Sequence, residues 1–152
     1  MTTIKLKIID NSELRKEINH LYEQTDQVTV AKWGLALAKH VLIHAKIDYN
    51  SIDELIDGFK ENENWQKNNA SLSDLRQASF NIHKLAQKCD SEITKTALRS
   101  AGQAVSSGHV KEHAMIASDY AIKTIGLLYS NDINAITLER EWQVNDLKRV
   151  RK

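Results

Sequence analysis

Residues 97–126 have the sequence ALRSAGQAVSSGHVKEHAMIASDYAIKTIG, a stretch that is unusually rich in alanine, glycine and serine. Small side chains allow the backbones of packed helices to approach each other closely. Apolar residues recur at helical spacing on both sides of Ser106-Ser107-Gly108, and this serine–glycine step is typical of a break in a helix. We therefore predict two helices, one on each side of the break, that lie in the centre of the fold.

Outside this stretch the chain contains further amphipathic segments, and most of them begin with a residue that can cap a helix. Asp, Asn and Ser side chains accept a hydrogen bond from the unpaired N–H groups of a first helical turn. The expected caps are Asn11 or Ser12, Asp26, Asn50 or Ser51, Ser71, Asp90 or Ser91, and Asn131 or Asp132. Ser71 followed by Asp74 also resembles a capping box. The pattern predicts an all-α, single-domain bundle of about seven helices over residues 1–152.

Three segments are expected to lie outside the helices. Within residues 1–10 the segment IKLKI at positions 4–8 alternates apolar residues and lysines, and we interpret residues 1–10 as an extended lead-in, because a single strand has no obvious partner here. The Asn-rich residues 62–69 are expected to form a loop. Residues 148–152, with the sequence KRVRK, are expected to form a basic tail that frays.

The composition argues against several classes of protein. The chain has 152 residues, a formal net charge of +1, no proline and one cysteine. A near-neutral charge gives no support to general nucleic-acid binding, and no apolar run approaches the ~20 residues of a membrane span. With Cys89 as the only cysteine, neither an intrachain disulfide nor a thiolate zinc cluster can form, which favours a reducing, cytoplasmic location. The oligomeric state stays open.

Two histidine pairs are the candidate metal ligands. His40 with His44, and His109 with His113, share the pattern H-V-x-x-H-A, in which residues four apart lie on one face of a helix. Each pair could hold one metal ion through two imidazole rings, and the second pair also matches the H-x-x-E-H signature. A helical metalloprotein or hydrolase would require the four rings to converge on one centre. Alternatively, the rings form hydrogen bonds within and between helices.

The predicted third helix has one acidic face. Its carboxylates are Asp53, Glu54, Asp57 and Glu61, and Lys60 is the only basic residue between positions 48 and 64. Such a face is usually a solvated helix surface, but it could also steer a basic partner. The segment Glu-Arg-Glu-Trp-Gln at residues 139–143 allows the same two interpretations, because arginine and tryptophan dominate binding hot spots.

Three motifs together resemble a known protein family. They are AGQAVSSGHVKEHA at residues 101–114, DYAIK at residues 119–123 and EREWQ at residues 139–143. This combination is similar to the all-helical fifth immunity class of bacterial polymorphic toxin systems. In that class a small-residue helix is followed by a Tyr-x-x-Lys segment and then by E-R-x-W-Q. The chain departs from the pattern at Gln103, where family members often have a histidine.

The resemblance implies a non-enzymatic protein without a cofactor, which binds a cognate protein toxin and blocks it by stoichiometric occlusion. The family-motif residues correspond to His109, His113, Tyr120, Lys123, Arg140, Trp142 and Gln143. Because they belong to a framework that the family shares, we expect them to hold the fold together. The toxin-facing surface can then lie elsewhere, and we expect it on the acidic face of Asp53, Glu54, Asp57 and Glu61.

Overall fold

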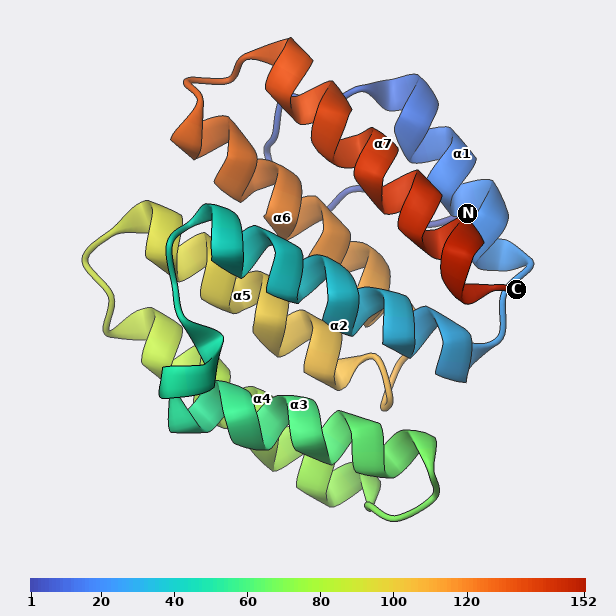
Figure 1. Ribbon diagram of the computed structural model, residues 1–152, viewed down its shortest axis with the longest axis vertical. Helices are drawn as coiled ribbons and strands as arrows, with labels where there is room; N and C mark the ends of the chain where they lie inside the picture. Colours follow the sequence, from blue (N-terminus) through green and yellow to red (C-terminus); the bar gives the residue numbers. More distant parts are fainter.

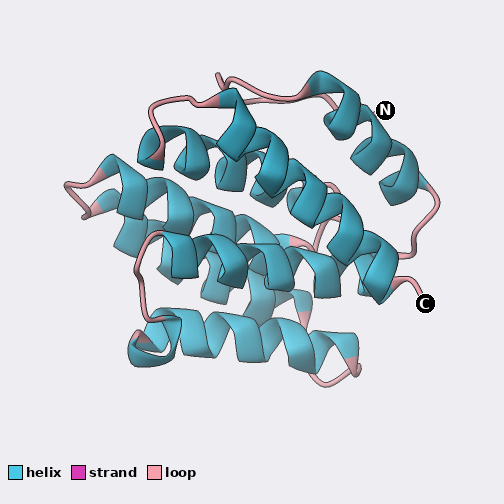
Figure 2. Cartoon of the chain, turned by 45° about the horizontal axis from the view of Figure 1, so that its top comes forward, coloured by secondary structure: helices cyan, strands magenta, loops and turns pink.

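The computed structural model describes residues 1–152 as a set of helices joined by short connections (Figure 1). The helices are α1 (Ser12–Glu23), α2 (Gln27–His44), α3 (Asp53–Gln66), α4 (Leu72–Gln87), α5 (Glu92–Ser106), α6 (His113–Leu128) and α7 (Ile133–Val150), and the 3₁₀ turn η1 (Tyr49–Ser51) precedes α3. The chain contains no strand (Figure 2), so the prediction of an all-α bundle of about seven helices is confirmed. None of the helices combines the length and the apolar character that crossing a membrane requires.

The helices are arranged in layers, with α2, α5 and α6 in the middle (Figure 1). The hairpin of α3 and α4 packs on one side of this layer, and α1 and α7 pack on the other. A Cβ atom added to Gly34 of α2 would lie 3.4 Å from the Cβ atom of Ala114 and 3.7 Å from that of Ala104. Small residues on α2, α5 and α6 therefore let the three central helices approach closely, as the composition of residues 97–126 predicts.

Most helices begin at a predicted cap. The side chains of Asn11, Asp26, Ser91 and Asp132 each accept a hydrogen bond from a backbone N–H group in the first turn of the helix that follows. Ser71 and Asp74 form the predicted capping box, because each side chain accepts a hydrogen bond from the other residue's backbone. These caps satisfy N–H groups that have no partner inside the helix, which explains where the helices start.

The start and the end of α3 differ from the prediction. Neither Asn50 nor Ser51 caps this helix, because both belong to η1. α3 begins at Asp53, and Ile52 occupies the cap position, where its side chain cannot accept a hydrogen bond. The expected loop at residues 62–69 is helical as far as Gln66. The reason is a tertiary contact: the amide of Asn62 is buried and donates a hydrogen bond to the carbonyl of Val105 on α5, at 2.9 Å.

The two ends of the chain pack against the bundle. Residues 1–11 contain no helix and no strand, and Ile8 packs against the hydrophobic core. At the other end α7 continues to Val150, so residues 148–150, which were expected in a fraying tail, are helical. Val150 also packs against the core, and Lys148 forms an ion pair of 3.2 Å with Glu17 of α1. These contacts with the rest of the molecule extend the helix.

Candidate functional site

A groove of about 840 Å³ lies between α3 and α4. Its lining contains five carboxylates, Asp53, Glu54, Asp57, Glu61 and Asp74, and three ammonium groups, Lys60, Lys84 and Lys88. The structure thus brings all four acidic residues of the predicted third helix into one groove, together with charges from α4 that the helix alone does not reveal.

Some of the charges in this groove stabilise the helices that carry them. Asp53 and Glu54 lie in the first turn of α3, Asp74 lies in the first turn of α4, and Lys84 lies in the last turn of α4. A helix has a partial positive charge at its N-terminus and a partial negative charge at its C-terminus, so each of these groups interacts favourably with its own helix. Their presence is therefore explained without a partner.

Asp57 and Glu61 have no such explanation. They lie beyond the first turn of α3, and four positions separate them, so they share one face of the helix. Like charges at this spacing destabilise a helix by about 0.2–0.5 kcal/mol. Neither carboxylate forms a hydrogen bond or an ion pair with the rest of the chain. This pair is therefore the part of the groove whose charge is not explained by the stability of α3 itself.

A second cluster lies where α2 packs against α7. His40 and His44 come from α2, and Glu139 and Trp142 come from α7. The His40 ring stacks on the Trp142 ring with 3.7 Å between the ring centroids, and its Nδ1 atom lies 2.9 Å from Glu139 Oε2. Ligand atoms of His40, His44 and Glu139 all lie within 4.8 Å of one another. A hollow of about 460 Å³ adjoins the cluster.

The second histidine pair does not share one face of a helix. α5 ends at Ser106 and α6 begins only at His113, so His109 lies in the exposed turn between them. Burial lowers the pKa of His113, and the nearby charges of His109 and Lys5 lower it further. Neither ring joins the group of His40 and His44. The four histidines therefore do not converge on one centre. The break at residues 107–112 places His109 outside the helix that begins at His113, so these two rings do not lie on one helical face.

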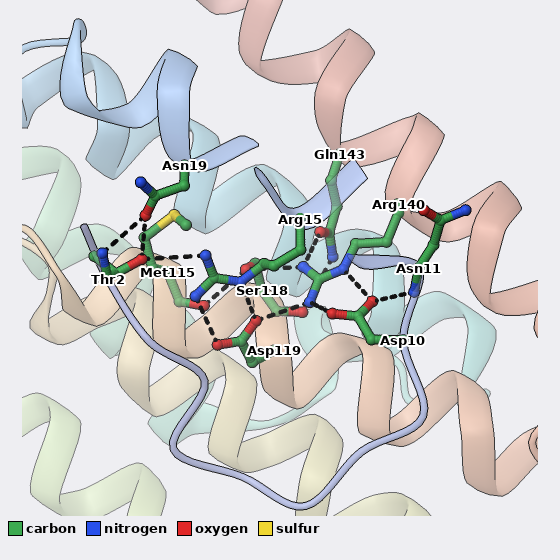
Figure 3. Close-up of polar contacts among 10 residues, drawn as sticks. All are labelled: Thr2, Asp10, Asn11, Arg15, Asn19, Met115, Ser118, Asp119, Arg140 and Gln143. Atoms are coloured by element: carbon green, nitrogen blue, oxygen red, sulfur yellow. Dashed lines mark hydrogen bonds and ion pairs between the residues drawn. The ribbon is translucent and has the colours of Figure 1, made fainter. Parts of the chain in front are cut away.

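Arg140 is completely buried and uses every nitrogen of its guanidinium group (Figure 3). Its Nε and Nη2 atoms donate to the two carboxylate oxygens of Asp10, both at 2.8 Å. Nη2 also donates to Asp119, and Nη1 donates to Ser118 and Gln143. Burial alone would lower the pKa of Arg140, but the hydrogen bonds and charges of Asp10 and Asp119 raise it above its ordinary value.

Asp119 joins this network to a second buried arginine (Figure 3). Arg15 on α1 donates to both carboxylate oxygens of Asp119, at 2.9 and 3.2 Å. Two arginines and two aspartates thus neutralise one another and connect the lead-in with α1, α6 and α7. Buried charges are stable only when they are paired and hydrogen-bonded, so this network holds the N-terminal segment against the bundle.

One known protein family matches most of the chain. Residues 20–150 match the family described as Imm-5 like putative immunity protein. The chain belongs to this family. No curated protein and no solved structure matched the chain.

In this Imm-5 like protein the family-motif residues differ in their surroundings, because Arg140 and Gln143 belong to the buried network whereas His109 is exposed. Gln143 is buried beside Arg140, and its carbonyl accepts a hydrogen bond of 2.9 Å from the indole of Trp33. Trp142 is partly buried against His40. Tyr120 and Lys123 are partly buried on α6. The contacts of Arg140, Trp142 and Gln143 fit a structural role for these three residues. For the other four motif residues that role stays a prediction.

Three charged partners in these clusters were missed by sequence reasoning. Asp10 and Arg15 lie before the segment that matches the Imm-5 like family, although they pair with Arg140 and Asp119 inside it. Glu139 belongs to the charged EREWQ segment, and only the structure shows that its side chain is 4% exposed beside His40. The one usable signal was the arginine in the EREWQ motif, because a buried arginine requires carboxylate partners.

Proposed function

We propose that this protein is an immunity protein, which binds a bacterial protein toxin and neutralises it by stoichiometric occlusion. The observation that carries this proposal is the match of residues 20–150 to the Imm-5 like family. Occlusion requires a surface that complements the toxin, and it requires no reaction chemistry from the immunity protein itself. We therefore propose a non-enzymatic role, in which one chain inactivates one toxin molecule.

We place the toxin contact in the groove between α3 and α4. Asp57 and Glu61 support this choice, because their mutual repulsion destabilises α3 and neither carboxylate forms an ion pair within the chain. A basic toxin surface would relieve this repulsion. Opposite charges also accelerate encounter and select the correct partner, and the acceleration falls as salt screens the charges. Asp53, Glu54 and the lysines of α4 would then orient the partner along the groove.

The role as an inhibitor is tested by co-expression with the toxin that is encoded beside this protein. We expect the wild-type protein to restore growth and to form a complex with the toxin. In vitro, toxin activity should fall linearly with added protein and end at one chain per toxin. Unchanged killing with no complex would contradict the proposal, and so would full inhibition at a small fraction of one equivalent, which indicates catalysis.

The position of the contact is tested with matched double variants. Asp57→Asn with Glu61→Gln removes the two groove carboxylates that lie beyond the first turns of α3 and α4. Asp90→Asn with Glu141→Gln makes the same two chemical changes at exposed positions outside the groove. We expect the first variant to weaken toxin binding by at least about tenfold, mainly through a slower association rate, and the second to bind like the wild type. Equal affinities for the two variants would place the contact elsewhere.

A further inference from the structure

We propose that His40, His44 and Glu139 form a binding site for one divalent transition-metal ion, and that Zn²⁺ fits it best. The inference concerns the interface between α2 and α7, not the groove between α3 and α4, and it does not depend on toxin binding. It uses the first histidine pair together with a carboxylate that only the tertiary structure brings beside it.

The ligand set has the chemistry of a zinc site. Two imidazoles and one carboxylate are a common protein ligand set for a zinc ion that keeps its fourth position open. His40 and His44 lie four positions apart on α2, so their rings project from the same face of the helix. Glu139 completes the group from α7, and the ligand atoms of the three residues lie within 4.8 Å of one another.

The distances require only side-chain adjustment. Ligand atoms that bind one zinc ion at about 2.0–2.1 Å lie roughly 3.3 Å apart when the geometry is tetrahedral. His40 Nδ1 and Glu139 Oε2 are already 2.9 Å apart, so these two atoms need to separate slightly to admit an ion. The remaining ligand atoms need to approach by at most about 1.5 Å, which rotations of the His44 and Glu139 side chains can supply.

The surroundings of the cluster also fit a metal site. Trp142 stacks on the His40 ring with an angle of 6° between the ring planes, and the His44 ring lies at 74° to the same imidazole with 4.8 Å between the ring centroids. Groups that fix the orientation of a ligand strengthen metal binding. The adjoining hollow, which Tyr129 and Leu138 also line, leaves room for a water molecule or a partner's side chain at the open position.

The carboxylate of Glu139 provides an independent argument. Its side chain is 4% exposed, and its only polar partner in the chain is His40. A buried carboxylate is costly unless its charge is compensated. A charged His40 alone would compensate it, but that ion pair gives no role to His44. The position of His44 beside both groups is what distinguishes a metal site from a simple ion pair.

The test uses the full chain after treatment with a chelator. Titration with ZnCl₂ in a calorimeter should show one ion bound per wild-type chain, and Co²⁺ should give the visible absorption bands of a tetrahedral site. His44→Ala should weaken Zn²⁺ binding by at least about tenfold, because it removes one of three ligands. This variant should fold normally, since His44 makes no hydrogen bond or ion pair within the chain, and circular dichroism checks this.

The control is His109→Ala, which removes an exposed histidine from the other H-V-x-x-H-A segment. It should bind Zn²⁺ like the wild-type protein. The proposal is overturned if the wild-type chain binds no stoichiometric Zn²⁺, or if His44→Ala binds it as tightly as the wild type does. Loss of binding in His109→Ala would also overturn it, because the ion would then be held by other residues.

Discussion

Replacing Arg140 by methionine should destabilise this protein more than any substitution of an exposed arginine. Methionine retains much of the aliphatic stem but removes the guanidinium group. Three hydrogen bonds to carboxylates disappear, two to Asp10 and one to Asp119, together with those to Ser118 and Gln143. Asp10 is then left without its arginine partner in a site where its side chain is only 8% exposed.

The expected size of the effect follows from the burial of the network. Removing one partner of a buried ion pair costs about 3–5 kcal/mol, chiefly because the remaining charge stays out of water without compensation. A domain of this size has a free energy of unfolding of about 5–15 kcal/mol, so the loss is a large fraction of the total. The melting temperature should fall by roughly 6–20 °C. Arg140→Lys should lie between the wild type and methionine, because an ammonium group cannot bind both carboxylates in a fork.

Urea denaturation followed by circular dichroism measures the change in the free energy of unfolding. The matched control is Arg76→Met, which makes the same substitution on α4. Arg76 is exposed and forms no hydrogen bond or ion pair within the chain, and substitutions at such surface positions usually change stability by no more than about 0.5 kcal/mol. If Arg140→Met cost no more than about 1 kcal/mol beyond Arg76→Met, the network would not be what secures the lead-in and α1.

Two further predictions concern a close packing contact and a partly buried histidine. Gly108→Ala should lower the free energy of unfolding by about 1–3 kcal/mol, because the new Cβ atom would lie 2.9 Å from the Trp65 ring. Gly34→Ala in α2 is the control and should be tolerated, since its new Cβ atom would lie no closer than 3.4 Å to its neighbours. Thermal melts of both variants compare them. Burial and the charge of Arg99 lower the pKa of His83 to about 4. The neutral ring therefore contributes its full share of the folding stability above pH 6.5, and this contribution is lost as the pH falls from 6.5 to about 4. An NMR titration should place its midpoint near 4, and a midpoint above about 6 would show that the ring is solvated.

Much of the helical framework could be predicted from local sequence, because a helix forms through interactions between residues about four positions apart. Asp26, Ser71 with Asp74, and Ser91 cap the helices that they were predicted to cap. The predictions failed where a distant contact decided the outcome. Residues 62–66 have the composition of a loop, yet the buried amide of Asn62 binds the Val105 carbonyl and the helix continues.

The candidate sites divide in the same way. Helical periodicity was sufficient to place Asp57 and Glu61 on one face, but only the packing of α3 on α4 makes that face one wall of a groove. Periodicity also aligned His40 with His44, whereas Glu139 reaches them from a position 99 residues away in the chain. For His109 and His113 the same periodicity was misleading, because the break that the serine–glycine step indicated extends to residue 112 and leaves His109 outside the helix that begins at His113.

The sequence by itself determined an all-α chain, its central small-residue helices and its family, since each depends on residue patterns along the chain. Only the tertiary structure decided which charges are buried together. Asp10 and Arg140 are 130 positions apart, and Arg15 and Asp119 are 104 apart, so no local pattern relates them. The energy of an ion pair depends on distance in space and on burial, and both quantities are set when the helices pack.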